Sequence, residues 1–279
     1  GPGFDSLAMA LDLRDTVSAQ LIDAHGIQVR ISGVGATTLP NDGNHLIARV
    51  LRTTALEWGM EIDGLILKCN NFIPHGKGLG SSAAAYLAGL LLARDLTQAR
   101  VTDAEILQRA TELEGHPDNV AACLYGGMTI ATWNDVRDVK AVSLPVHTDV
   151  MAVIGVPAGE LSTEQARGLL PEKVSYADAV FNTSRAALLV AALTHSPEAL
   201  FDATDDRLHQ QYRRMAYPKS IELVQLLREA GIGAAISGAG PSVIALTTRE
   251  KVTIASELIT ASEFQAQTLK PSRTGALVY

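Results

Sequence analysis

Cysteine is scarce in this sequence, and no hydrophobic run is long enough to cross a membrane. Only 2 cysteines occur in 279 residues, which excludes the disulfide framework of a small secreted protein. The apolar run of residues 83–93 ends at Arg94 and Asp95, well short of the roughly 20 residues that a membrane-spanning helix needs. No pair of closely spaced cysteines and no His/Cys cluster indicates zinc. We therefore expect a cytoplasmic protein without a membrane partner.

Positive charge is also in deficit, with 23 Lys and Arg against 30 Asp and Glu and a net charge of −7. The absence of a basic stripe argues against a nucleic-acid partner. Hydrophobic residues make up 47% of the chain and charged residues 19%, which is typical of a soluble globular enzyme rather than a disordered chain. The length indicates about two domains. An anionic substrate would therefore need local Arg or Lys side chains, a metal ion or helix N-termini.

The most informative segment is glycine-rich and covers residues 74–85, with the sequence PHGKGLGSSAAA. Three glycines at alternate positions let the backbone turn tightly and approach a ligand closely. Two serines and an alanine-rich run follow, so we expect a loop that leads into a buried helix. The N–H groups at a helix start favour bound phosphate. The predicted nucleotide-phosphate residues are Pro74, Gly76, Lys77, Gly78, Leu79, Gly80, Ser81, Ser82 and Ala83.

Two commoner phosphate-binding loops, the Walker A loop and the Rossmann loop, have sequence patterns close to this segment. A Walker A loop requires Ser or Thr directly after Gly-Lys, but Gly78 follows Lys77. Residues 78–83 do satisfy the loose Rossmann pattern, whose confirming acid lies about 20 residues further on at a strand end. The nearest acid, Asp95, follows a helical run instead. A Rossmann-type oxidoreductase and a glycine turn without a ligand remain alternatives.

Periodicity and capping signals predict mixed strands and helices without a regular βαβα repeat, which favours an α+β architecture. Thr102 and Glu105 form a predicted capping box, and Ser196 is a predicted N-cap before Pro197. The expected strands are residues 17–22, 28–32, 64–70, 128–133, 150–156, 234–237, 243–247 and 275–278. The expected helices are residues 46–58, 83–96, 103–114, 120–124, 184–194, 197–202, 207–215, 220–230 and 251–261.

A second polar segment, residues 112–119 with the sequence ELEGHPDN, places three acids, a histidine and an asparagine at a predicted helix end. In isolation a helix terminus followed by a turn explains these residue types equally well. Beside a phosphate loop they also suit Mg²⁺, which binds a carboxylate together with oxygen donors such as a loop hydroxyl.

The glycine-rich segment, the EGHPDN run at residues 114–119 and the SGAGPS run at residues 237–242 resemble, in order, the three motifs of the GHMP small-molecule kinases. Within that superfamily, four further segments resemble the homoserine kinases, and the resemblance covers essentially the whole chain. These segments are residues 1–7, 116–119, 162–167 and 208–213.

This resemblance implies a two-domain α+β fold with the active site between the domains. Residues 1–144 would form the GHMP kinase N-terminal ATP-binding domain, and residues 145–279 a C-terminal ferredoxin-like domain. The implied reaction uses ATP and Mg²⁺ to phosphorylate the side-chain hydroxyl of L-homoserine, giving O-phospho-L-homoserine for threonine biosynthesis. A homodimer is compatible with the resemblance.

The resemblance also implies roles for individual residues. Glu114 would hold Mg²⁺ with Ser81 or Ser82, and Asn44 would contact adenine. Gly238 and Gly240 would support the floor of the active site. The implied substrate ligands are Asp5 for the ammonium group, Arg167 and Arg213 for the carboxylate, and His116, Asn119 and Thr163 around the rest of the molecule.

Several of these residues also have ordinary structural explanations. Asp5 would equally suit the N-cap of a helix that begins near Leu7, and the two arginines would equally suit the surface. His209 and the remaining histidines are expected to be structural. The sequence starts at Gly1 rather than Met, so we expect it to lack an N-terminal segment that carries a substrate-contacting Asn in the family.

The catalytic residues implied by the resemblance are Glu114, His116 and Asn119, and Asn119 raises a mechanistic question. Relatives such as mevalonate kinase have a catalytic Asp at this place, and an amide is no general base at neutral pH. We therefore hypothesise phosphoryl transfer without a protein base, in which Asn119 orients the hydroxyl and Asp118 is structural. Asp118 as the base, a mevalonate or diphosphocytidyl-methylerythritol kinase, and a non-catalytic ligand-binding member remain alternatives.

Overall fold

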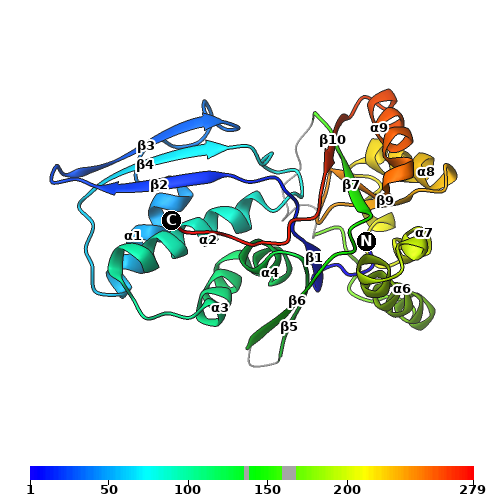
Figure 1. Ribbon diagram of the computed structural model, residues 1–279, viewed down its shortest axis with the longest axis horizontal. Helices are drawn as coiled ribbons and strands as arrows, with labels where there is room; N and C mark the ends of the chain where they lie inside the picture. The colour runs from blue at the N-terminus through cyan, green and yellow to red at the C-terminus, as the bar shows by residue number, and fades with distance from the viewer. Residues whose placement is uncertain (135–137, 159–167) are drawn as a thin grey trace.

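Two lobes joined by a central layer make up the computed structural model, which describes residues 1–134, 138–158 and 168–279 (Figure 1). The left-hand lobe contains β2 (Thr16–Leu21), β3 (Gly26–Gly33), α1 (Leu46–Glu57), β4 (Gly64–Asn71), α2 (Ser81–Thr97) and α3 (Asp103–Glu114). The central layer contains β1 (Leu7–Met9), α4 (Asp118–Tyr125), β5 (Met128–Trp133) and β6 (Val139–Leu144). The right-hand lobe contains β7 (Val150–Val156), α6 (Tyr176–Thr194), α7 (Leu200–Ala203), α8 (Pro218–Glu229), β8 (Gly233–Ile236), β9 (Val243–Thr248), α9 (Val252–Ala261) and β10 (Gln265–Leu269).

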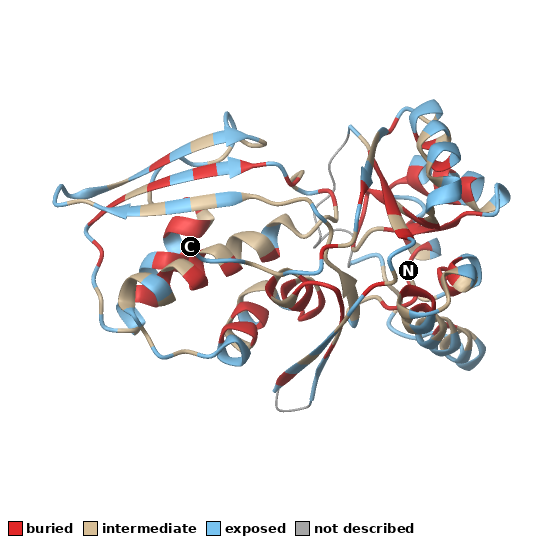
Figure 2. Ribbon diagram, viewed as in Figure 1, coloured by how far each residue is buried: buried red, intermediate tan, exposed pale blue. Residues whose placement is uncertain are grey.

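The left-hand sheet has the order β2-β4-β3, and its central strand β4 explains how the helices are held. Strand β4 pairs antiparallel with β2 and parallel with β3, and α1 forms the crossover between the parallel strands. Leu65, Leu67 and Cys69 alternate along β4 and are buried. Gly89 lets α2 approach α1 closely, because an added Cβ would lie 2.7 Å from a side-chain atom of Val50. Figure 2 shows the resulting buried faces between sheet and helices.

The right-hand lobe has the ferredoxin-like arrangement that the resemblance to the GHMP kinases implies. Its four strands have the spatial order β10-β7-β9-β8, and all neighbours are antiparallel. In chain order this is 4-1-3-2, with α8 before β8 and α9 between β9 and β10. Leu223 and Leu227 of α8 and Ile259 of α9 are buried in one core cluster with this sheet. The two-domain α+β fold is therefore confirmed.

Each end of the chain lies on the lobe that is built by the opposite half of the sequence (Figure 1). The N-terminus lies in the right-hand lobe, where the Pro2 carbonyl accepts a hydrogen bond from Asn182 of α6 at 3.1 Å. The C-terminal tail returns to the left-hand lobe, where the Ala276 N–H donates to the Cys123 carbonyl at 2.8 Å. Arg14 holds this tail through the Gly275 carbonyl, also at 2.8 Å. A domain division between residues 144 and 145 stays a prediction.

Four local predictions are wrong. Residues 275–278 form no strand, and the last strand of the sheet is β10, which the sequence analysis missed together with β1 and β6. Residues 207–215 contain only a short 3₁₀ turn, Gln211–Arg213, in place of a helix. Asp5 begins no helix, because it has a φ of 63° and is followed by β1. Ser196 precedes Pro197 as expected but makes no side-chain cap hydrogen bond.

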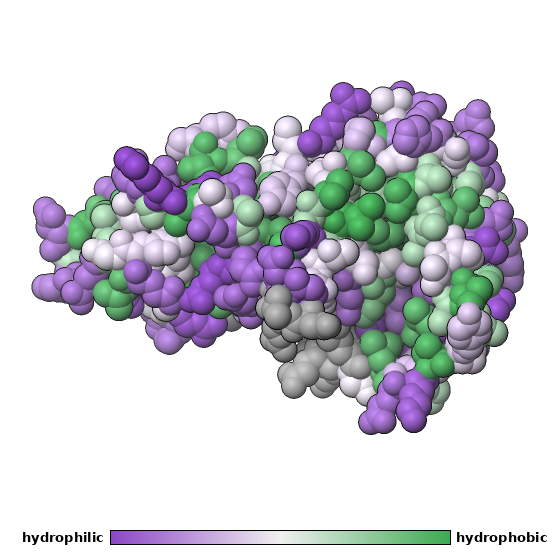
Figure 3. Space-filling model, turned by 90° about the horizontal axis from the view of Figure 1, so that it is seen from below, coloured by the Kyte–Doolittle hydropathy of each residue, from purple (hydrophilic) through white to green (hydrophobic). Residues whose placement is uncertain are grey.

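Among the described residues, no helix is long and apolar enough to cross a membrane. Seen from below, hydrophilic residues cover much of the left-hand lobe, and hydrophobic residues gather over part of the right-hand lobe (Figure 3).

The caps of the right-hand helices give a matched pair of stability predictions. Ser175 Oγ accepts a hydrogen bond from the Asp178 N–H at 3.0 Å at the start of α6, whereas Ser196 makes no such bond. We expect Ser175→Ala to lower the free energy of unfolding by about 1 kcal/mol, or the melting midpoint by roughly 2–4 °C. Ser196→Ala is the control and should lower the free energy of unfolding by less than half as much as Ser175→Ala. Equal shifts in thermal unfolding of the two variants would contradict this assignment.

Candidate active site

The glycine-rich segment forms the loop between β4 and α2, as predicted. Gly76, Gly78 and Gly80 have φ values of 63°, 71° and 77°, which is backbone that other residues rarely adopt. Gly80 is the N-cap of α2 and provides no side-chain hydrogen bond. The N–H groups of the first turn are therefore open to an anion at the positive end of the helix dipole.

A second loop, residues 237–242 between β8 and β9, lies directly against the glycine-rich loop. Ser237 Oγ donates to the Gly78 carbonyl at 2.8 Å, and the Ser242 N–H donates to the Lys77 carbonyl at 3.3 Å. Gly238 and Gly240 in this loop have φ values of 53° and 85°. The predicted supporting loop thus joins the right-hand lobe to the glycine-rich loop of the left-hand lobe.

Lys77 strengthens the same junction. Its side chain is buried, and Nζ donates to the Pro157 carbonyl at 2.9 Å and to the Ala158 carbonyl at 3.1 Å, both directly after β7. The ammonium group therefore points toward the other lobe. Asp15 fixes the beginning of the loop, since its carboxylate accepts the Ile73 N–H at 2.9 Å.

The EGHPDN segment brings its polar groups together at the start of α2. Ser82 Oγ donates to Glu114 Oε2 at 2.6 Å, although the two residues are 32 positions apart in the chain. His116 Nδ1 lies 2.7 Å from Asp118 Oδ1, and because a carboxylate only accepts, Nδ1 carries the proton. Asp118 Oδ1 also accepts the Asn119 N–H at 2.8 Å. Asp118 thus orients both neighbours.

These oxygen donors fit Mg²⁺. The Glu114 side chain is only 8% exposed, and its carboxylate already lies beside a loop hydroxyl at the mouth of a helix that favours phosphate. A magnesium ion that arrives with a nucleotide needs one or two carboxylates plus phosphate oxygens and water, not a full protein cage. The described residues accordingly hold no cluster of three or more His, Cys, Asp or Glu side chains suited to a metal ion.

A cavity of about 1080 Å³ connects Ser82 and Asn119 with the N-terminal segment Gly1–Phe4, whereas Glu114 and His116 are not among the residues that line it. It also continues along α2 as far as Leu96 and under the C-terminal tail, so it is larger than one nucleotide site. The predicted residues that line it are Asn44, Gly78, Leu79, Gly80, Ser81, Ser82, Asn119 and Gly238. Asn44 lines the cavity next to His45, and its side-chain amide donates a hydrogen bond to Asp42 Oδ2 at 3.2 Å.

The predicted carboxylate ligand Arg213 is fully buried and is not among the residues that line this cavity. Its guanidinium carbon is 4.5 Å above the Phe4 ring, and Asp5 is the next residue in the chain. Arg213 also hydrogen-bonds to Tyr217, whose hydroxyl donates to the Ala239 carbonyl at 3.0 Å in the 237–242 loop. Burial raises the pKa of Tyr217 to about 12.

The structure thus brings together Ser82 with Glu114, His116 with Asn119 through Asp118, and Arg213 with the Asp5 segment. Thr163 and Arg167 lie outside the described residues. The contacts of Lys77, Asp15 and Tyr217 were not predicted from the sequence. Of these three residues, only Asp15 had a local signal in the sequence, namely an acidic side chain just before a predicted strand.

Comparison with known proteins agrees with this geometry. The profile of the GHMP kinases N terminal domain matches residues 45–127, and that of the GHMP kinases C terminal region matches residues 188–261. The chain therefore belongs to the GHMP kinases, a class of small-molecule phosphotransferases.

Sequence identity then places it more narrowly within that class. Homoserine kinase from Streptomyces coelicolor is 47% identical to this chain, over 100% of this chain's length and 90% of the relative's length. The crystal structure of homoserine kinase from Cytophaga hutchinsonii has a TM-score of 0.85 at 27% identity, over 98% of this chain and 91% of the other. The chain is thus a member of the homoserine kinase family. A mevalonate kinase with a TM-score of 0.68 at 16% identity, over 96% and 92% of the two chains, shares the fold alone.

The contact between the two loops yields a matched pair of predictions. A Cβ on Gly78 would lie 2.2 Å from the Ser237 carbonyl oxygen, whereas a Cβ on Gly76 would meet nothing within 4 Å. We expect Gly76→Ala to lower the free energy of unfolding by about 1–2 kcal/mol, from its positive φ alone. Gly78→Ala should lower it by at least about 1 kcal/mol more and weaken nucleotide binding, because the loops must separate. Urea unfolding and ATP titration would test this, and indistinguishable variants would contradict it.

Proposed function

We propose that this protein transfers the γ-phosphoryl group of ATP to the side-chain hydroxyl of L-homoserine. The supporting observation is one continuous cavity that joins the uncapped start of α2, Asn119 and the Gly1–Phe4 segment next to Arg213. The triphosphate would lie on the N–H groups of the glycine-rich loop. The amino acid would lie between this loop and Arg213. A Rossmann-type oxidoreductase is not favoured, since its doubly wound parallel sheet is absent among the described strands.

The substrate contacts follow from the charges of L-homoserine. Arg213 would bind the carboxylate, because a planar guanidinium matches its two oxygens. Asp5 would bind the ammonium group. His116 and Asn119 would hold the end that reacts. Thr163 and Arg167 lie outside the described residues and stay predicted ligands of the substrate. The contact of Asn44 with adenine also stays a prediction.

In the transfer step, the substrate hydroxyl oxygen forms a bond to the γ-phosphorus while the bond from that phosphorus to the β–γ bridging oxygen breaks. ADP leaves with the bridging oxygen, and the hydroxyl proton moves to an oxygen of the transferred phosphoryl group. Positioning and electrostatic stabilisation account for most of the acceleration of such a reaction. Glu114 and Ser82 would hold Mg²⁺, which supplies positive charge at the phosphate oxygens. Glu114 is thus a ligand of the metal rather than a base.

The protein groups near the hydroxyl favour transfer without a general base. The Asn119 amide is no base at neutral pH. The Asp118 Oδ1 atom already accepts hydrogen bonds from His116 Nδ1 and from the Asn119 N–H. Asn119 would therefore orient the hydroxyl, and Asp118 would orient Asn119 and His116. A homodimer stays a prediction from the resemblance, and a cytoplasmic location stays a prediction from the composition.

A substrate panel tests the proposed function. We expect ADP release with L-homoserine to exceed that with L-serine by roughly tenfold to two-hundredfold in kcat/KM, because L-serine is one methylene shorter. L-threonine and mevalonate should be poorer still. A coupled assay for ADP with all four compounds makes the comparison. A preference for mevalonate would reassign the substrate, and no turnover with any compound would favour a ligand-binding role.

Two variants test the role of Asp118. We expect Asp118→Asn to retain kcat within about tenfold, because the new amide oxygen still accepts the His116 proton. Loss of a general base would instead lower kcat by about 10²–10⁴-fold. Asn119→Ala should lower kcat through poorer orientation of the hydroxyl. If Asp118→Asn abolishes turnover while folding and substrate binding persist, Asp118 is the base.

A further inference from the structure

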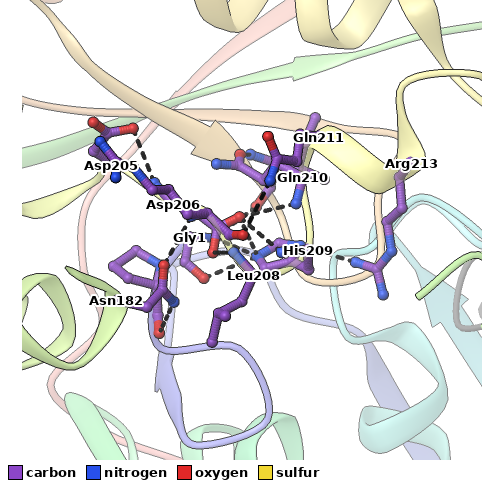
Figure 4. A network of polar contacts seen from close by, with 12 residues as sticks. Gly1, Asn182, Asp205, Asp206, Leu208, His209, Gln210, Gln211 and Arg213 are labelled. Atoms are coloured by element: carbon purple, nitrogen blue, oxygen red, sulfur yellow. Dashed lines mark hydrogen bonds and ion pairs between the residues drawn. The ribbon is translucent and has the colours of Figure 1, made fainter. Parts of the chain in front are cut away.

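The loop that carries Arg213 is held by a buried polar network on the right-hand lobe (Figure 4). The Asp206 carboxylate, whose side chain has no exposed surface, accepts the N–H groups of Leu208 at 3.2 Å, His209 at 3.1 Å and Gln210 at 2.9 Å. Gln210 Oε1 in turn accepts the Ile236 N–H just before the 237–242 loop. Asp206 therefore fixes the backbone from which the Arg213 side chain extends.

His209 lies at the centre of this network and contacts Arg213 directly. Its side chain is 1% exposed. His209 Nδ1 is 3.1 Å from Arg213 Nη1, and His209 Nε2 is 2.9 Å from the Gly1 carbonyl (Figure 4). A guanidinium only donates and a carbonyl only accepts, so these two contacts require Nδ1 to accept and Nε2 to carry the proton. The Gly1 terminal nitrogen, 3.3 Å from the same Nε2, makes a longer contact. Both contacts therefore require the same neutral tautomer.

Other properties of His209 agree with this tautomer. Burial, and after it the positive charges of the Gly1 terminus and Arg213, lowers the pKa of His209 to about 3 against the opposing effect of Asp206, which leaves the ring neutral near pH 7. The 3.8 Å separation between Nε2 and Asp206 Oδ2 is too long for a hydrogen bond, and a neutral ring forms no ion pair there.

The ring of His209 also connects Arg213 with the segment that carries Asp5. The Phe4 ring stacks on the His209 ring, with centroids 4.5 Å apart and an interplanar angle of 27°. The Arg213 guanidinium carbon also lies 4.5 Å from the centroid of the Phe4 ring. Asn182 completes the connection, because it donates to the Pro2 carbonyl and accepts the Arg207 N–H at 2.8 Å. His209 thus touches both segments that would hold the two charged groups of the amino acid.

We propose that neutral His209 is a positioning residue that aims the Arg213 guanidinium at the substrate carboxylate and thereby sets the affinity for the amino acid. This inference rests on the proposed function, because it needs Arg213 to bind that carboxylate. His209 contacts Gly1, Phe4 and Arg213, so in the proposed complex it would touch neither phosphate nor the reacting hydroxyl. Its loss should therefore change KM for the amino acid and leave the transfer step alone.

His209→Ala tests the proposal, with His209→Asn as the conservative variant and His195→Ala as a control at the exposed end of α6. The Asn Oδ1 atom stands close to the former Nδ1 position and can still accept from Arg213. We expect His209→Ala to raise KM for L-homoserine by roughly ten- to hundredfold, the effect of one hydrogen bond to a charged group. KM for ATP and kcat should stay within about threefold of the wild-type values, and His209→Asn should recover most of the loss.

A second substrate separates positioning from a general loss of structure. With 3-aminopropan-1-ol, which lacks the carboxylate, the initial slope of rate against concentration should be the same for wild type and His209→Ala. An equal loss on both substrates, or a fall in kcat without a change in KM for L-homoserine, would overturn the proposal. If the wild type itself fails to phosphorylate L-homoserine, the proposed function is wrong and the inference falls with it.

Discussion

The contact between the glycine-rich loop and the 237–242 loop is the constraint on which the site depends. Phosphate would bind to the left-hand lobe, whereas Arg213 belongs to the right-hand lobe, so catalysis needs a fixed distance between them. Ser237 and Lys77 set that distance through hydrogen bonds to main-chain carbonyls of the opposite lobe. Only glycine at position 78 leaves room for this approach, since any Cβ would collide with the Ser237 carbonyl.

Local signals in the sequence predicted much of this arrangement. The glycine spacing and the apolar run after it located the loop and α2, and the capping box of Thr102 and Glu105 located α3 correctly. The resemblance to the GHMP kinases supplied what spacing alone did not, namely that Glu114 belongs beside Ser82. It also supplied the ferredoxin-like order of β7–β10, which depends on long-range pairing. Strands β1 and β10 were missed because short strands gain their stability from partners far away in the chain.

The 206–213 segment shows why the remainder was not predictable. Its apolar spacing suits a helix, but the Asp206 carboxylate accepts three successive main-chain N–H groups and stabilises a compact turn instead. The sequence also contains nothing to indicate that His209 meets Gly1, a residue 208 positions earlier. Such contacts follow from the assembled lobes, so a histidine expected to be structural acquires a specific neighbour in Arg213.

The exchange of chain ends between the lobes has a consequence for synthesis on the ribosome. Pro2 can meet its partner Asn182 only after the ribosome has added 180 further residues. The Cys123 carbonyl likewise receives the Ala276 N–H only after more than 150 further residues have been made. Neither half can reach its final form alone during elongation. Each lobe gains these contacts only once the partner segment from the other half of the sequence has been synthesised.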